Sequence, residues 1–443
     1  MFNRVRRFVL FAIGASVPIQ GVAFDAGGLL ATPFKLAVAV LLVMATVQYA
    51  ARSGGSHRDR KTLWIIGFAV SFFVGTVMAL VAGLPPAPVL RSSTTMIALI
   101  SFYLLLGYAV DSKEDIVRLL WGLAFGGAFT VLPAVVGLQQ SQSVVAYGHE
   151  RFSGLSGQEN LLGADMCVVL AASAGLFFIA RSKVRRAILI GIVTLATAGI
   201  ALSLSRSAFL ALGFMWGLWL YRSGSRGNLQ YAVLAGMLAI VSLAFLPESV
   251  MDRLGTIFDA TERARDGSIQ GRFEVGAWGI RAFMSNPIVG VGTPRFPVWV
   301  HEQPDGLSAS WHTIHNAYIG IAAEQGLLGL VPFLAILTIS WMDYTACWRA
   351  VRSRRLINDP VLTELGHLAL FLQIALLSGL VGGMFHQQHR SKTMWLMMAL
   401  SPIVLSLARE RLEALRGPDE VEAPLFPTAD EPHDPPHAIP ASL

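Results

Sequence analysis

Two histidines open a long apolar segment in the last third of the chain. His312 and His315 stand one helical turn apart at the start of WHTIHNAYIGIAAEQGLLGL, residues 311–330. A histidine at the mouth of a membrane helix is costly unless it faces water or a partner, so it is a functional candidate. A neutral imidazole can accept a proton near neutral pH, which makes both histidines candidate general bases.

His315 is the stronger candidate base because Asn316 follows it at the start of the predicted helix. Free N–H groups and the positive end of the helix dipole disfavour a protonated imidazole there, so His315 would remain a usable base. The alternative is that one of the two histidines only caps the helix or binds a lipid headgroup. Arginines elsewhere in the chain favour the catalytic interpretation.

Three arginines are candidate phosphate ligands, since a guanidinium presents a planar fork of donors that matches phosphate oxygens. Arg206 lies in a short turn between two apolar spans, Arg151 opens RFSGLSGQENLLGADM, and Arg272 begins a predicted helix in a long loop. Each also has a simpler interpretation. Arg206 could extend its charge to the headgroup level, Arg151 could be an ordinary loop charge, and Arg272 could pair with Glu274.

A metal site is a competing interpretation of the histidines. His312 and His315 are three positions apart, and further possible ligands share their side of the membrane, namely His301, Glu302, Asp305, His386 and His389. The spacing matches no HExxH pattern, and the nearby arginines would repel a cation. We therefore predict a metal-independent site without a cofactor. The sequence also lacks a Walker lysine motif, which argues against ATP-driven work.

The composition indicates that these residues sit in a membrane protein. Of the 443 residues, 54% are hydrophobic and only 14% are charged, whereas soluble proteins carry about a quarter charged residues. No soluble basic module with interleaved aromatics is visible, so nucleic acid is not an expected partner. Cys167 and Cys347 fall in or at the end of apolar runs, which predicts neither a disulfide nor a thiolate metal site.

We expect an all-α integral membrane protein with about 12 transmembrane helices, each of about 20 residues. The expected spans are residues 8–24, 30–50, 63–82, 94–110, 116–138, 160–180, 187–203, 207–221, 229–246, 315–343, 366–386 and 392–408. The first could pass for a signal peptide, but hydrophobic spans keep following, so we interpret it as an uncleaved helix.

Basic residues predict the orientation of the spans. Arginines and lysines gather before the first span and in loops at 52–61, 181–186, 222–228 and 349–355. Each of these loops follows an even-numbered span, so all of them fall on the same side of the membrane. The positive-inside rule therefore places these loops and both termini in the cytoplasm. Every candidate site residue then lies at the opposite face of the membrane.

We divide the chain into a membrane domain, residues 1–416, and a tail, residues 417–443. The tail is rich in proline and acidic residues and cannot bury enough apolar area to offset chain entropy, so we expect it to be disordered and cytoplasmic. The membrane domain includes a long non-cytoplasmic loop, residues 247–314, between the ninth and tenth spans.

The long loop is predicted to carry short helices that cap the outer face. One helix has apolar residues at a helical spacing that gives it one face to bury, at Phe273, Ala277, Ile280 and Met284. We interpret Arg281 and Arg295 in this loop as structural or surface residues.

Four motifs of this chain, taken together, resemble those of the bacterial O-antigen ligase and O-antigen polymerase family. They are the HN…GLLGL pattern at His315–Leu330, SRSAFL around Arg206, RFSGLSGQEN at Arg151 and the run from Arg272 to Gly292. The resemblance covers about residues 145–345 in motifs, and the whole chain in span count. The histidine element is the most specific of the four, whereas the arginine motifs gain weight from their order.

The resemblance implies glycosyl transfer at the periplasmic face of the bacterial inner membrane. The donor would be a glycan on undecaprenyl pyrophosphate, and the acceptor would be lipid A core for a ligase or another lipid-linked glycan for a polymerase. His315 would be the general base, Arg206 and Arg272 would hold the pyrophosphate, and Arg151 is a looser transfer of the same role. His312 and Asn316 are secondary candidates.

Elementary chemistry agrees with these roles. The donor already carries a good leaving group, so the protein must supply a base, worth roughly 10²–10⁴ in rate, and positive charge beside the departing pyrophosphate. A direct displacement of this kind inverts the anomeric centre. We place a ligase ahead of a polymerase; a protein-targeting oligosaccharyltransferase belongs to the same class.

A transporter or flippase for lipid-linked glycans is the alternative from another class, since it too would have about a dozen spans. It predicts charged residues and broken helices at the bilayer midplane. The charged residues of this chain gather instead at the outer edge of the predicted spans.

Overall fold

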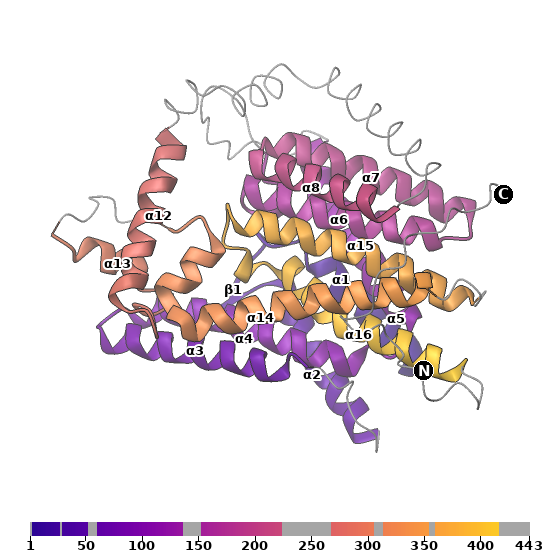
Figure 1. Cartoon of the computed structure of the whole chain (residues 1–443), viewed down its shortest axis with the longest axis horizontal. Coiled ribbons are helices and arrows are strands. Elements are labelled where there is room, and N and C mark those ends of the chain that lie inside the picture. Colours follow the sequence, from indigo (N-terminus) through magenta and orange to yellow (C-terminus); the bar gives the residue numbers. More distant parts are fainter. Residues whose placement is uncertain are drawn as a thin grey trace.

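The computed structural model describes residues 2–26, 29–51, 60–135, 152–223, 267–304, 313–353 and 359–415. Their long helices run side by side as a bundle (Figure 1). The helices are α1 (Phe2–Ser16), α2 (Pro33–Ala51), α3 (Thr62–Val81), α4 (Pro86–Ala109), α5 (Lys113–Val135), α6 (Glu159–Ile179), α7 (Lys183–Ser203), α8 (Arg206–Ser223), α12 (Gly267–Ser285), α13 (Phe296–His301), α14 (Ala317–Ser353), α15 (Pro360–Gly383) and α16 (Lys392–Ala414), with short 3₁₀ turns η1 (Gly154–Ser156) and η2 (Gln388–Arg390).

Seven helices within the described ranges are long and apolar enough to cross a membrane. The prediction of an all-α integral membrane protein is therefore confirmed. The count of about 12 spans stays a prediction, and the expected span at 229–246 and the tail at 417–443 lie outside the described residues.

A short hairpin follows the first helix, and the sequence did not predict it. Strands β1 (Phe24–Ala26) and β2 (Leu29–Ala31) pair antiparallel, with Phe24 opposite Ala31. The first span was expected to reach residue 24, but α1 ends at Ser16. Pro18 and Gly21 follow this helix end, and the Gly21 N–H donates to the Leu155 carbonyl instead of continuing a helix.

Close contact between helices holds the bundle together. α15 lies in the middle, because 83% of its most apolar window is buried, against 33% for α3. α1 and α5 approach until their backbones touch: a Cβ at Gly122 would lie 2.1 Å from the Phe11 carbonyl oxygen, and one at Gly126 would lie 2.2 Å from that of Ala15. This is the small-xxx-small packing that membrane helices favour.

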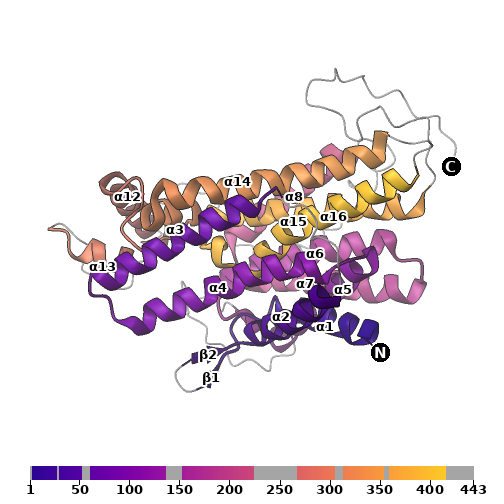
Figure 2. The same ribbon diagram turned by 90° about the horizontal axis from the view of Figure 1, so that it is seen from below.

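The two ends of the bundle differ in the segments that they carry. The start of α1 and the end of α16 lie at one end, whereas α12 and α13 lie at the other (Figure 2). We call these the termini end and the loop end. The loop end also holds the starts of α8, α14 and α16 and the end of α15. The candidate site residues belong to α8, to α12 and to the segment just before α14.

α14 is broken near its start, at Gly326, where φ is 60° and ψ is −157°. Within α14 only Gly326 departs from helical geometry. The segment after α12 fills the break: the N–H groups of Val291 and Gly292 donate to the carbonyls of Ala323 and Glu324, at 2.9 and 3.1 Å. The two carbonyls that the break removes from the helix therefore still have hydrogen-bond partners, as buried backbone groups require.

The other side of the break is closed in the same way. The N–H groups of Leu327 and Leu328 donate to the carbonyls of Pro287 and Ile288, at 2.8 and 3.0 Å. A Cβ at Gly326 would lie 2.4 Å from the Ile288 backbone. Glycine is needed at this position both for its positive φ and for this close approach.

α12 buries a different face from the one that the sequence predicted. Phe273 is 78% exposed and Met284 is 70% exposed, so the predicted stripe points away from the protein. The buried face carries Val275, Trp278 and Ala282, which cluster with Ile314, Phe296 and Val300. The prediction was wrong because α12 is apolar on two faces, and periodicity does not tell which face meets α14.

Candidate active site

The start of α14 is held by Asn316. Its side-chain oxygen accepts hydrogen bonds from the N–H groups of Tyr318 and Ile319, at 2.9 and 3.0 Å, which is the usual geometry of a helix N-cap. Its amide nitrogen donates to the Met384 carbonyl, at 3.1 Å. Asn316 thus ties the start of α14, next to His315, to the end of α15.

A second contact between the same two helices strengthens this junction. The Tyr318 hydroxyl donates to the Leu380 carbonyl, at 2.9 Å. Its ring lies over Gly383, where an added Cβ would come within 3.2 Å of the hydroxyl. The first turn of α14 is therefore docked on the last turn of α15.

His315 lies directly before the first turn of α14, at the loop end. Desolvation by the surrounding protein, followed by the positive charge of Arg272, lowers the pKa of His315 below its ordinary value. A lowered pKa keeps the imidazole neutral at neutral pH, which is the form that accepts a proton. Arg272 therefore lies close enough to His315 for its charge to act on the imidazole.

The packing of α12 explains how Arg272 reaches His315. Gly279 lies two turns after Arg272 on α12, so both residues share one face of the helix. A Cβ at Gly279 would lie 2.6 Å from the Ile319 side chain and 3.0 Å from that of Ile314. This close approach lays the Arg272 face of α12 along the residues that flank His315.

Arg206 is the first residue of α8 and follows a tight turn. Leu204 has a positive φ of 47°, and the Ser205 carbonyl accepts the N–H of Ala208, at 3.0 Å. The Ser207 hydroxyl shares a hydrogen bond of 2.7 Å with Nε2 of His386, and it lies 3.0 Å from the Ser205 hydroxyl. The start of α8 is thereby fixed to the segment that follows α15.

The segment from Met384 to His386 connects the two halves of the site. The Met384 carbonyl binds Asn316, next to His315, and the His386 ring binds Ser207, next to Arg206. The candidate base and the candidate phosphate ligand of α8 are therefore joined through one short segment.

His386 is the residue that sequence reasoning missed. The sequence suggests His386 only as a possible metal ligand. Its place in the HQQHRSK connection, on the same predicted outer side as His315 and Arg206, was a signal that it could belong to the site. It lies 179 positions from its partner Ser207, and no local pattern marks such a pair.

Two candidates lie outside the described residues, Arg151 and His312, and so does Asp305. Their proposed roles stay predictions.

Two further arginines of the loop end make local contacts. Arg295 pairs with Glu302 at 2.8 Å, and the Arg281 guanidinium lies 4.7 Å from the centre of the Trp278 ring. These contacts agree with the structural or surface interpretation of both arginines.

The other histidines do not converge on a metal centre within the part of the chain that the structure describes. That part holds no group of three or more His, Cys, Asp or Glu side chains with the geometry of a metal site. His301 is exposed at the end of α13. Burial, and then the charge of Arg390, lowers the pKa of His389 well below its ordinary value.

The comparison with protein families identifies the segment that contains this arrangement. Residues 190–334 match the family model described as O-antigen ligase. The match spans less than half of the chain, and it includes Arg206, Arg272 and His315 but not Arg151 or His386. No curated protein matches the chain.

Proposed function

The chain carries an O-antigen ligase family segment at residues 190–334, and from that premise we propose that it transfers a glycan from undecaprenyl pyrophosphate to a sugar hydroxyl. The preferred acceptor is the lipid A core, which makes the protein an O-antigen ligase. A polymerase, which would use a second lipid-linked glycan as acceptor, is the alternative within the same chemistry.

The observation that carries this proposal is the junction of three elements at the loop end. Arg272 lies close enough to His315 for its charge to act on the imidazole. Asn316, next to His315, binds the Met384 carbonyl, and His386 binds Ser207, next to Arg206. A base and two guanidinium groups are the minimum that a displacement at a phosphate-linked sugar requires.

In the proposed mechanism, His315 accepts the proton of the acceptor hydroxyl as its oxygen attacks the anomeric carbon. The new glycosidic bond forms while the bond from the anomeric carbon to the pyrophosphate oxygen breaks, and undecaprenyl pyrophosphate leaves with the bonding electrons. Attack opposite the leaving group inverts the anomeric centre. The proton then passes from the imidazolium to solvent.

Arg206 and Arg272 stabilise the charge that grows on the pyrophosphate. Each charged hydrogen bond of this kind is worth about 1.5–3 kcal/mol, and two such groups can supply the positive charge that a metal provides in other transferases. His386 acts on Arg206 indirectly, because its bond to Ser207 fixes the first turn of α8. Arg151 is proposed as a third pyrophosphate ligand.

The proposed setting is the bacterial inner membrane, with both termini and the tail in the cytoplasm. The loop end then faces the periplasm, where the lipid-linked donor is presented. The loop basic residues support this orientation through the positive-inside rule.

The test is transfer by the purified protein, with lipid-linked glycan and lipid A core, in the presence of a metal chelator and without ATP. We expect product, and we expect His315→Ala to lower the rate by roughly 10²–10⁴. His301→Ala is the matched control, since it removes another histidine of the loop end. Full activity of His315→Ala would contradict the mechanism, and dependence on a divalent metal would contradict its metal-free form.

The envelope of a deletion strain separates the two acceptors. A ligase predicts loss of long glycan from lipid A core, with lipid-linked polymer accumulating. A polymerase predicts cores that carry a single repeat.

The transporter alternative gains one observation, the break in α14, because broken helices are typical of transporters. In transporters the freed backbone groups bind the substrate or ion. Here the carbonyls of Ala323 and Glu324 and the N–H groups of Leu327 and Leu328 are bonded to the chain itself. The break therefore supports a rigid loop end better than it supports a transport site.

A further inference from the structure

A second group of cations lies at the loop end, on helices other than α8 and α12, which carry Arg206 and Arg272. Lys35 belongs to α2, Arg91 to α4 and Lys392 to α16; we call these three residues the lysine cluster. The Lys35 ammonium donates to the Thr94 hydroxyl, at 3.1 Å, and Arg91 lies close enough to Lys35 for their charges to repel. Lys35 in turn lies close enough to repel Lys392.

Lys392 forms the buried base of the lysine cluster. Its side chain is only 8% exposed. Its ammonium donates to the Ile19 carbonyl, at 3.1 Å, and lies 5.2 Å from the centre of the Phe34 ring, next to Lys35. A buried lysine in a membrane protein is costly, so its retention calls for a partner or a function.

One carboxylate, Asp165 of α6, offsets part of this charge. Asp165 is fully buried and accepts hydrogen bonds from the Gln20 amide, at 2.7 Å, and from the Thr393 hydroxyl, at 2.9 Å. Its charge attracts Lys392. These contacts fix Lys392 in place, while Lys35 and Arg91 stand further out on the surface.

Cations that repel one another are stabilised when an anion binds between them. Lys35 lies on the first turn of α2 and Arg91 on the second turn of α4, so both side chains sit at the loop end of their helices, where lipid headgroups begin. The anion available at that depth is a lipid phosphate, and ammonium and guanidinium groups are its usual ligands.

We propose that Lys35 and Arg91, supported by buried Lys392, bind a phosphate on the lipid of the acceptor glycolipid. This assignment rests on the proposed function only in naming the acceptor. The donor pyrophosphate is assigned to Arg206 and Arg272 on α8 and α12, so the two substrates use different elements. The connection from Met384 to Ser391, which carries His386, leads directly into Lys392 and thus joins the two regions in the chain.

Binding of the acceptor, without donor and without turnover, tests the proposal. The full chain in phosphatidylcholine nanodiscs is titrated with lipid A core and with the same glycolipid after removal of its lipid phosphates. We expect Lys35→Gln/Arg91→Gln to weaken binding of the phosphorylated acceptor at least tenfold and to leave binding of the dephosphorylated acceptor unchanged. Both positions are at least partly exposed, so the variant should fold.

Arg118→Gln/Arg185→Gln is the matched control, since it removes two exposed cations on α5 and α7 near the termini end. Unchanged binding in the Lys35/Arg91 variant would overturn the proposal, and so would an equal loss for both glycolipids. Adding phosphatidylglycerol to the nanodiscs separates the two sources of lipid phosphate. Competition by phosphatidylglycerol at the concentration of the acceptor would identify a general headgroup site and overturn the acceptor assignment.

The same experiment distinguishes failure of the lysine cluster proposal from failure of the proposed function. Phosphate-dependent binding without any transfer to the bound glycolipid would leave the lysine cluster supported and the ligase activity refuted.

Discussion

The termini end and the loop end of the bundle use charge in opposite ways. At the termini end several cations face carboxylates. Arg6 lies 2.6 Å from Asp111 and 3.1 Å from Asp115, and Arg411 lies 2.6 Å from Asp359. These pairs join α1 to the start of α5 and α15 to α16.

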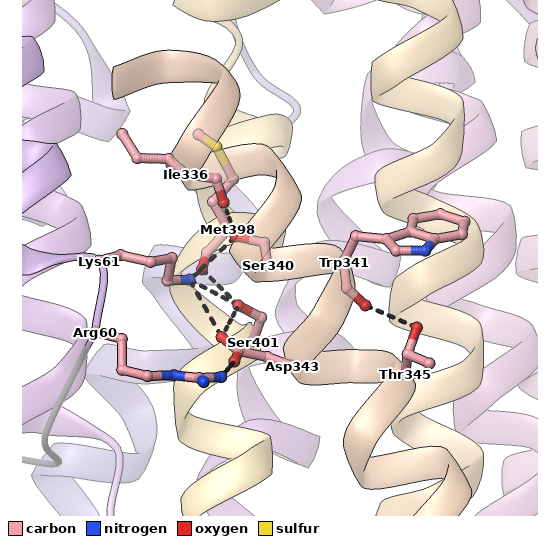
Figure 3. Close-up of polar contacts among 9 residues, drawn as sticks. All are labelled: Arg60, Lys61, Ile336, Ser340, Trp341, Asp343, Thr345, Met398 and Ser401. Carbon is pink, nitrogen blue, oxygen red and sulfur yellow. Dashed lines mark hydrogen bonds and ion pairs between the residues drawn. The ribbon is translucent and has the colours of Figure 1, made fainter. Parts of the chain in front are cut away.

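The most buried pair of the termini end joins three helices (Figure 3). The Lys61 side chain has no exposed surface, and its ammonium donates to the hydroxyls of Ser340 and Ser401, at 3.0 and 2.7 Å, and to the Met398 carbonyl, at 2.6 Å. Asp343 lies 3.9 Å away and balances the charge. Lys61 thus holds α3 against α14 and α16.

At the loop end basic side chains stand beside one another. Arg272 acts on His315, Arg91 acts on Lys35, and Lys35 acts on Lys392. Ion pairs are present there too, such as Arg390 with Glu324 at 3.8 Å. The difference teaches that charge at the termini end joins the helices of the fold, whereas we propose that charge at the loop end receives an anion.

The largest effect that tests this difference is expected at the termini end. Asp343→Ala leaves the Lys61 ammonium buried with neutral partners only, and loss of one member of a buried pair costs about 3–5 kcal/mol. We expect a large fall in the thermal stability of the detergent-solubilised protein, with the transfer rate per folded molecule unchanged.

Arg60→Ala is the matched control for that experiment. Arg60 also contacts Asp343, at 3.0 Å, but its side chain is 56% exposed, and exposed pairs contribute only about 0–1 kcal/mol. Equal destabilisation by Asp343→Ala and Arg60→Ala would remove the distinction between the buried clamp and its exposed neighbour.

The next effect concerns the phosphate ligand of α8. Arg206→Ala should weaken donor binding by about 1.5–3 kcal/mol, the value of a charged hydrogen bond, with the acceptor KM and the thermal stability little changed. Arg206→Lys should recover only part of the loss, because lysine cannot bind phosphate through two parallel bonds. A measured donor affinity equal to that of the unchanged protein would show that Arg206 serves the fold, as the cations of the termini end do.

Sequence reasoning predicts features that depend on residue type and misses contacts that depend on distant pairing. Composition was enough for the membrane class, and residue types with their order were enough to propose Arg206, Arg272 and His315. The break at Gly326 is closed by Pro287–Gly292, and the N-cap of α14 reaches across to Met384. Such contacts form between segments whose local patterns are unrelated.

The same limit explains the error on α12. Helical periodicity identifies apolar faces, and this helix has two of them. Only the position of Ile314 and Ile319 decides that Val275, Trp278 and Ala282 are the buried set, and that position depends on where α14 begins.

A smaller effect tests the hydrogen bond that sequence reasoning missed. Ser207→Ala and His386→Ala should each slow transfer about fivefold, since a neutral hydrogen bond contributes about 1 kcal/mol, and the double variant should be no slower than either single one. His386→Gln keeps a polar nitrogen near the Nε2 position and should retain most of the activity. A loss in His386→Gln equal to that in His386→Ala would indicate that His386 exchanges a proton in the reaction and does more than position Arg206.

The smallest expected effect is a shift in the pH profile that separates the two ends of the bundle. His315 must be neutral to accept a proton, so kcat/KM should fall as the pH drops through its pKa, which desolvation and Arg272 hold below the ordinary value. Arg272→Gln removes the second of these causes, so the acid limb of the profile should move to higher pH while the rate also falls. Arg411→Gln, at the termini end, should leave the acid limb in place, because Arg411 acts on Asp359 and not on His315. An acid limb that stays fixed in Arg272→Gln would mean that the titrating base is not His315, and the cation-beside-cation arrangement would then have no role in setting the proton transfer.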